Sequence, residues 1–96
     1  APQWVNLGRG YNVPLLEWLD RYTFPTEAAF ADPEYAKQVY EGMVRALLAN
    51  GTTCACYFGS RDNPANVCLV QAMERQGQRG LVGRVCMDCN TPAWYC

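Results

Sequence analysis

The chain has 96 residues, of which half are apolar, and its 8 basic and 9 acidic side chains leave a net charge of -1. This apolar content excludes a disordered segment, and the balanced charge excludes a basic nucleic-acid-binding tail. The longest uncharged run, Ala46–Ser60, is interrupted by Asn50–Thr53 and therefore does not form a membrane span. A chain of this length forms one domain at most.

The first part of the chain is expected to contain a loop and one helix. Residues 1–12 hold glycines and asparagines without a helical or strand period, which is typical of a loop. A helix is expected to start at Pro14, because proline is tolerated at the first helical position. We expect this helix to end near Tyr22, before Thr23-Phe24-Pro25.

The clearest helical pattern follows Asp32. This aspartate can cap the helix, Pro33 occupies the first helical position, and Gly51 provides a stop. Apolar residues recur at the helical period: Ala36, Val39, Tyr40, Met43, Val44, Leu47 and Leu48. The next segment, Thr52–Phe58, is uncharged and rich in threonine, cysteine and aromatics, which predicts a strand buried on both faces.

A third helix and a second strand complete the pattern. Asn63 and Pro64 are expected to cap and start the helix, and Gly77 to stop it. Its inward-facing residues are expected to be Val67, Val70 and Met73. Leu81–Met87 reads as a strand, and Asp88–Cys96 as irregular structure.

This order of helix, helix, strand, helix, strand predicts an α/β fold. Two strands joined by a helix form a βαβ unit with parallel strands and a right-handed crossover, which is the repeating unit of a β/α barrel. Because two strands cannot close a barrel, residues 1–96 are expected to be an incomplete segment of a single barrel domain. Its strand edges would be unpaired, so the segment should be at best marginally folded alone.

The six cysteines allow three interpretations. Cys54, Cys56 and Cys68 fall in a predicted strand and helix, which favours reduced thiols in a core. A secreted disulfide-rich binding protein would instead contain no free thiols. The pairs Cys54-x-Cys56 and Cys86-x-x-Cys89 would supply four thiolates to a structural zinc site if neighbouring strands brought them together, but this spacing is not specific.

Three segments resemble the guanine deaminases of the zinc-dependent amidohydrolase superfamily. They are P-L-L-E-W-L-D-R-Y-T-F-P-T-E-A-A-F from Pro14 to Phe30, N-G-T-T-C-A-C-Y-F from Asn50 to Phe58, and G-Q-R-G-L-V-G-R-V-C-M-D from Gly77 to Asp88. The opening Ala1-Pro2-Gln3 matches the residues that follow the His-x-His zinc motif of that family. The resemblance covers nearly the whole chain and departs at Gly59–Asp62 and at Cys89.

The resemblance implies hydrolysis of guanine to xanthine and ammonia by a zinc-activated water in a complete enzyme. It implies that Gln3 contacts the purine through its carboxamide and that Ala1 and Pro2 shape the pocket by backbone position. Trp4 is an adjacent stacking candidate. A homodimer and a cytosolic location follow from the same resemblance.

The chain contains no histidine. We therefore expect the metal ligands and proton-transfer residues to lie outside it, no zinc to be bound by this segment, and the segment to be inactive alone. The competing hypothesis is a non-catalytic truncated product, or a small α/β module that binds a partner through its strand edges. A catalytic role for Asp88, and base stacking by Trp18, Tyr22 and Phe24, are less favoured than capping and packing roles.

Overall fold

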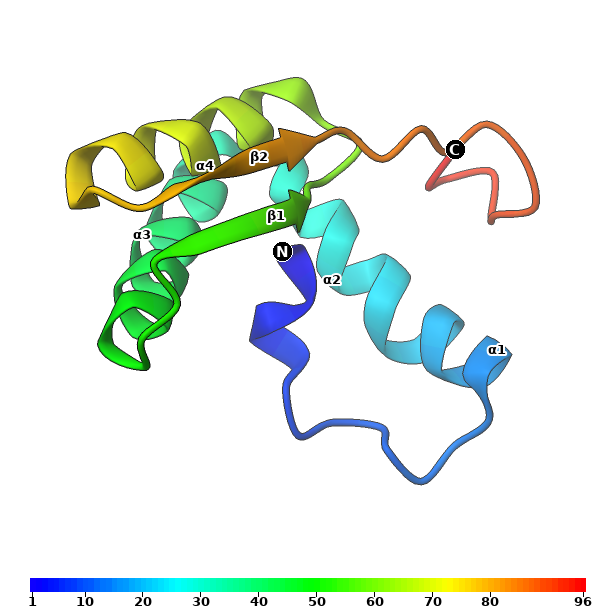
Figure 1. Ribbon diagram of the computed structural model, residues 1–96. Helices are drawn as coiled ribbons and strands as arrows, with labels where there is room; N and C mark the ends of the chain where they lie inside the picture. Colours follow the sequence, from blue (N-terminus) through cyan, green and yellow to red (C-terminus); the bar gives the residue numbers. More distant parts are fainter.

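Two parallel strands and several helices form an α/β structure in this computed structural model, which describes residues 1–96 (Figure 1). In chain order the elements are the 3₁₀ helix Pro2–Asn6, α1 (Leu15–Trp18), the π-helical turn Leu19–Thr23, α2 (Phe24–Ala28), the 3₁₀ turn Ala29–Ala31, α3 (Pro33–Ala49), β1 (Cys54–Phe58), α4 (Asn63–Gln76) and β2 (Arg79–Gly83). The strands pair in parallel, with Cys54 opposite Arg79 and Phe58 opposite Gly83. The predicted parallel βαβ unit is confirmed.

The hydrophobic core lies between α3, α4 and one face of the sheet. Its buried members are Phe30, Ala36, Tyr40, Met43, Val44, Tyr57, Ala65, Leu69, Ala72 and Met73. Ala55 and Val82 extend the core along the strands. The two long helices therefore cover the sheet on one side.

Helical structure continues to Ala31, so the prediction that the first helix ends near Tyr22 was wrong. Proline lacks the N–H that an α-helical ladder requires. Before Pro25 the backbone widens into the π-helical turn, in which the N–H of Phe24 donates to the carbonyl of Leu19. This local change lets the helical path pass the proline. The predicted N-terminal loop also contains the 3₁₀ helix Pro2–Asn6.

The caps of the two long helices largely match the sequence pattern. Asp32 accepts a hydrogen bond from the backbone N–H of Glu34 at 3.0 Å and caps α3. Gly51 and Gly77 adopt φ angles of +89° and +77° after the two helices, as their predicted role as stops requires. The N-cap of α4 is Asp62 rather than Asn63.

The predicted inward face of α4 was wrong for two of its three residues. Val67 and Val70 are 52% and 40% exposed, whereas Met73 is buried. The buried face is formed by Ala65, Leu69 and Ala72. Two alanines on this face permit close packing against α3, so steric fit overrides side-chain hydrophobicity.

The strands are covered on one face only, which contradicts the predicted burial of Thr52–Phe58 on both faces. Tyr57 points into the core, whereas Cys54, Cys56 and Phe58 are exposed on the opposite face. Leu81 of β2 is also exposed on that side, opposite Cys56. Apolar composition indicates that a strand can be buried on both faces. It does not determine whether another part of the chain packs against the second face. β2 is also shorter and earlier than the predicted Leu81–Met87.

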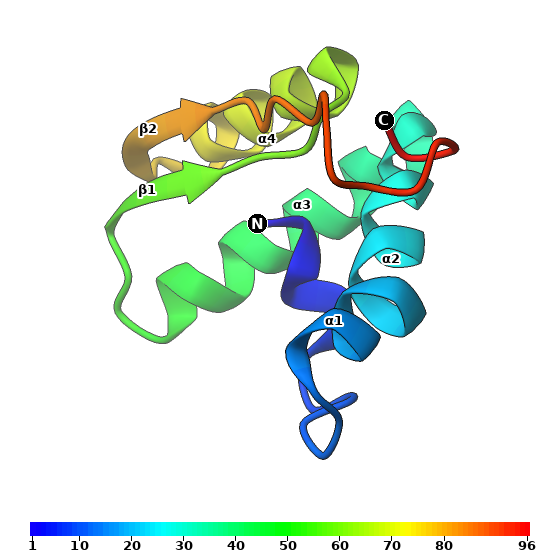
Figure 2. The ribbon, with the colours of Figure 1, turned by 90° about the vertical axis from the view of Figure 1, so that its right-hand side faces the viewer.

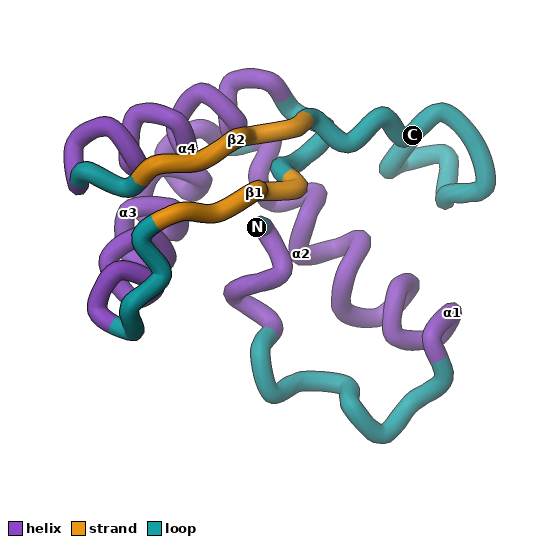
Figure 3. Tube along the Cα trace, viewed as in Figure 1, coloured by secondary structure: helices purple, strands orange, loops and turns teal.

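All six cysteines are unpaired, and five of them are exposed. Cys68 is only half-buried, so the expected burial of Cys54, Cys56 and Cys68 was wrong. Figure 2 shows the irregular C-terminal segment passing from β2 to the region of α2, and Figure 3 shows that this segment is loop. No helix combines the length and apolar content that crossing a membrane requires.

Candidate functional site

The strongest candidate site is a cavity of about 320 Å³ at the carboxyl end of the sheet. Figure 1 shows the N-terminus beside the end of β1 and next to α2. The cavity is lined by Ala1, Pro2, Gln3, Leu19, Thr23, Phe24, Glu27, Phe58, Gly59, Val85 and Met87. In parallel α/β folds, loops at this edge of the sheet build binding sites.

The first residues are held against β1 by backbone hydrogen bonds. The amino group of Ala1 donates to the carbonyl oxygen of Phe58 at 2.6 Å, and the N–H of Trp4 donates to the carbonyl of Ala1 at 3.1 Å. Pro2 is buried. The 3₁₀ turn therefore presents Gln3 at the cavity.

A buried carboxylate lies behind Gln3. Glu27 is 8% exposed, and its Oε1 accepts a hydrogen bond from Nε2 of Gln3 at 3.1 Å. The other carboxylate oxygen, Oε2, accepts a hydrogen bond from the hydroxyl of Tyr95. A buried carboxylate requires such donors, because each replaces lost hydration. These contacts join the N-terminal turn, α2 and the C-terminal segment.

Tyr95 is itself enclosed. Its side chain is fully buried, with the ring 5.0 Å from that of Phe24 and the guanidinium of Arg61 4.8 Å from its centroid. Burial raises the pKa of Tyr95, and its hydrogen bond to Glu27 raises it further. The phenol therefore remains a proton donor to Glu27 throughout the neutral range.

The cavity wall also contains an unpaired hydroxyl. Thr23 is 1% exposed, and its Oγ1 has no hydrogen-bond partner within the protein. Buried polar atoms in proteins are nearly always paired with protein or ordered water. Thr23 is therefore a residue of the cavity wall whose buried hydroxyl lacks a partner within the protein.

Three of the four substrate-binding residues suggested by the sequence lie together. Ala1, Pro2 and Gln3 all line the cavity. Trp4 does not: it packs against the core, and a Cβ at Gly42 of α3 would lie 3.7 Å from its ring. Trp4 therefore serves packing in this structure.

Sequence reasoning missed Glu27 and Thr23 as site residues. Both belong to the Pro14–Phe30 segment. The available signal was that Glu27 directly precedes the apolar residues Ala28-Ala29-Phe30, which indicates a charge near the core. Trp18 and Tyr22 pack on the N-terminal loop, since a Cβ at Gly10 would lie 2.7 Å from each side chain. They contact this loop rather than the buried core.

No three His, Cys, Asp or Glu side chains lie close enough together to hold a metal ion. The hypothesis that Cys54, Cys56, Cys86 and Cys89 gather around a zinc ion therefore finds no support. The side chains of residues 1–96 do not by themselves fit the zinc that the sequence resemblance implies.

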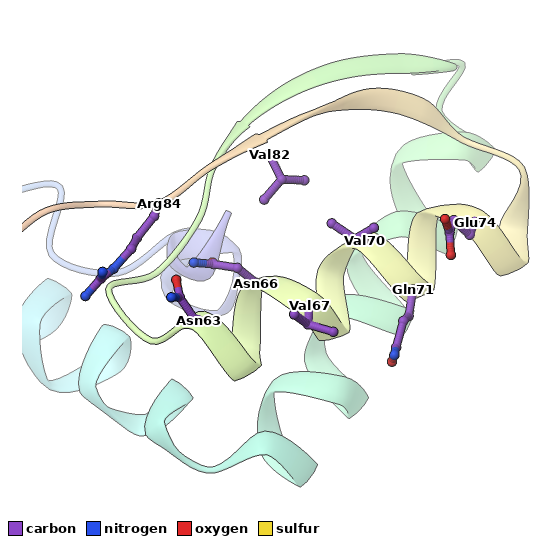
Figure 4. Close-up of a pocket in the computed structure, with 8 residues that line it drawn as sticks. All are labelled: Asn63, Asn66, Val67, Val70, Gln71, Glu74, Val82 and Arg84. Atoms are coloured by element: carbon purple, nitrogen blue, oxygen red, sulfur yellow. The ribbon is translucent and has the colours of Figure 1, made fainter.

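A second hollow of about 580 Å³ lies between α4 and β2. Figure 4 shows Val67 and Val70 of α4 and Val82 of β2 at its centre. Asn63, Asn66, Gln71, Glu74 and Arg84 surround them. This hollow is larger than the cavity at Gln3, but it contains none of the residues suggested as site residues and no buried carboxylate.

Comparison with known proteins gives consistent matches over most of the chain. Residues 4–92 match the model of the amidohydrolase family. The chain is 48% identical to the guanine deaminase of Mus musculus over 90 residues, which are 94% of this chain and 20% of that protein. It is 45% identical to the probable guanine deaminase of Schizosaccharomyces pombe over 96 residues, which are 100% of this chain and 18% of that protein.

A solved structure is similar over nearly the same range. Guanine deaminase from C. acetobutylicum, with guanine bound in its active site, matches with a TM-score of 0.94 and 38% identity. The match covers 99% of this chain and 23% of that one. The chain thus spans about a fifth of the length of the relatives it matches.

Proposed function

Because this chain belongs to the amidohydrolase family, we propose that it forms part of a guanine deaminase-like enzyme that hydrolyses guanine to xanthine and ammonia. Similarity to guanine deaminases over 94% of the chain carries the proposal. The grouping of Ala1, Pro2 and Gln3 around one cavity at the carboxyl end of parallel strands supports it.

We propose that residues 1–96 are an incomplete segment of one β/α-barrel domain. The exposed sheet face supports this, since Phe58 and Leu81 are 79% and 72% exposed although their strands are apolar. In a closed barrel such side chains fill the interior. Both outer strand edges also remain free, because the sheet has only two strands.

Within the proposed site, Gln3 binds the purine. Its carboxamide offers hydrogen-bond donors and an acceptor, which match the adjacent carbonyl and ring nitrogens of guanine. Ala1 and Pro2 shape the cavity through their backbone, while Phe24 and Phe58 supply apolar wall.

No catalytic step is assigned to this segment. The family's zinc would be held by residues outside positions 1–96, as would the groups that transfer protons. The segment should therefore not deaminate guanine alone, because it has no means to activate water. The homodimer and the cytosolic location of the complete enzyme stay predictions from the sequence resemblance.

A segment exchange tests the proposal. The aligned residues of the mouse guanine deaminase are replaced by this chain, and xanthine formation is measured. We expect the chimera to deaminate guanine. Gln3→Ala in the chimera should lower kcat/KM by about 10- to 100-fold, which corresponds to loss of hydrogen bonds to a bound substrate. A folded chimera without activity would contradict the proposal.

The second test uses the isolated chain. With zinc and guanine added, the 96-residue chain should form no xanthine above the background without protein. Sustained turnover would show that the segment contains its own catalytic group. A stable, cooperative thermal transition of the isolated chain would favour the alternative of a self-contained α/β interaction module.

A further inference from the structure

A buried acid contacts the proposed substrate-binding residue directly. Glu27 has no role in the function proposed above, yet the residue is only 8% exposed and its carboxylate is hydrogen-bonded at both oxygens. An isolated buried carboxylate is strongly unfavourable, so its partners are structurally significant. One partner is Gln3, and the other is Tyr95.

The contact between Glu27 and Gln3 determines which way the carboxamide faces. Nε2 of Gln3 donates to Oε1 of Glu27 at 3.1 Å, so the NH₂ end of the Gln3 side chain faces Glu27. A flipped amide would place its carbonyl oxygen against the carboxylate, which is electrostatically unfavourable. The carbonyl oxygen of Gln3 and its second N–H are therefore left for a ligand.

Tyr95 restricts Glu27 in turn. Its hydroxyl donates to the carboxylate from a position 68 residues away in the chain, and its ring lies against Phe24 and Arg61. Rotation of the Glu27 carboxylate would break this bond. The orientation of the Gln3 carboxamide is thus set by a series of three side chains, Tyr95, Glu27 and Gln3.

We propose that Glu27 is a positioning residue for the proposed deamination, which fixes Gln3 so that one acceptor and one donor face the purine in a defined order. Tyr95 supports Glu27 in this role. The inference rests on the proposed function. It implies that the site prefers a purine whose edge carries a hydrogen-bond donor next to an acceptor. In the opposite arrangement, donors of the purine would face donors of Gln3 and acceptors would face acceptors.

Steady-state kinetics of the mouse chimera test the proposal. Glu27→Gln keeps the size of the side chain but allows both amide orientations of Gln3. We expect KM for guanine to rise about 10-fold and kcat to change less than about 3-fold, because the change affects binding rather than the reacting bond. The same substitution at Glu34, which is exposed on α3, should change neither value.

A double-mutant cycle separates positioning from general structure. If Glu27 acts through Gln3, Glu27→Gln should raise KM in the parent chimera and have no further effect in the Gln3→Ala background. Equal effects in both backgrounds would overturn the proposal. Tyr95→Phe, which keeps the buried ring, should raise KM in the same direction by a smaller factor. It also serves as the second variant if Glu27→Gln does not fold.

Thermal midpoints show whether each variant is folded, and crystal structures show the orientation of Gln3. Together with the kinetics they distinguish failure of the proposed function from failure of the positioning role. An inactive but folded chimera would contradict the proposed function, whereas an active chimera with a normal KM in Glu27→Gln would contradict positioning alone. If Glu27 positions Gln3, crystal structures should show one Gln3 orientation beside Glu27 in the parent chimera and a displaced or mixed one in Glu27→Gln. An unchanged carboxamide in both would overturn the inference.

Discussion

The two faces of the sheet differ in what they contact. On one face, Tyr57, Ala55 and Val82 pack into the core with α3 and α4. On the other face, Cys54, Cys56, Phe58 and Leu81 are exposed although they belong to the same apolar strands. The covered face supplies the tertiary packing of this chain. The open face has the composition of an interior without its cover, which supports the proposal of a barrel segment.

The largest test of this comparison uses two leucines. Leu69 of α4 is fully buried in the core, whereas Leu81 on the open face is 72% exposed. Leu69→Ala should remove about 2–5 kcal/mol of stability, enough to unfold a marginally stable chain. Leu81→Ala should change stability by about 0.5 kcal/mol or less. Circular dichroism at the helical minimum during urea titration measures both.

Similar effects of the two leucine substitutions would contradict the one-sided packing. If Leu81→Ala in the isolated chain were as destabilising as Leu69→Ala, the open face would have to be covered in solution. Sedimentation velocity would then show whether a second copy provides the cover.

The second test uses two glycines of β2. A Cβ at Gly80 would lie 2.2 Å from the carbonyl oxygen of Ala55 and 2.8 Å from Met73, so Gly80→Ala forces the strands apart. At Gly83 the nearest atom would be 3.8 Å away. We expect Gly80→Ala to cost about 1–3 kcal/mol, as overpacking typically does. Gly83→Ala should leave the unfolding midpoint nearly unchanged.

The third and smallest effect concerns alkaline pH. Burial raises the pKa of Tyr57, whose hydroxyl donates to Gln78 at 2.6 Å. The phenol ionises at lower pH in the unfolded chain than in the folded one. The contribution of Tyr57 to the free energy of unfolding is therefore fully present below the unfolded pKa of about 10, and it is lost as the pH rises through the folded pKa. Tyr57→Phe should make the decline above about pH 10 shallower, measured as the urea midpoint at increasing pH. An unchanged slope would show that Tyr57 does not contribute.

Local sequence signals predicted the helices and the topology well. Asp32, Gly51 and Gly77 act as expected because caps and stops depend on the chemistry of a few adjacent residues. The failures occurred where distant parts of the chain decide. The face that α4 buries depends on the fit of Ala65 and Ala72 against α3, and Pro25 is accommodated by a π-helical turn that no pattern announced.

The candidate site could be predicted only in part. Ala1, Pro2 and Gln3 were available from the resemblance of a contiguous motif, and they line the cavity. Glu27 and Tyr95 could not be paired in advance, because a hydrogen bond across 68 residues leaves no periodic trace in the sequence. Trp4, adjacent to Gln3 in the sequence, packs against the core near Gly42 of α3 instead of lining the cavity.

Residue order alone was enough for the helix boundaries set by caps, for the parallel βαβ connection, and for the resemblance to a family of hydrolases. These depend on short-range geometry and on contiguous motifs. Which strand face is covered, and that Glu27 is buried behind Gln3 with Tyr95 against it, emerge only when the chain is folded. Burial and long-range hydrogen bonds are properties of packed surfaces, to which residues far apart in the chain contribute jointly.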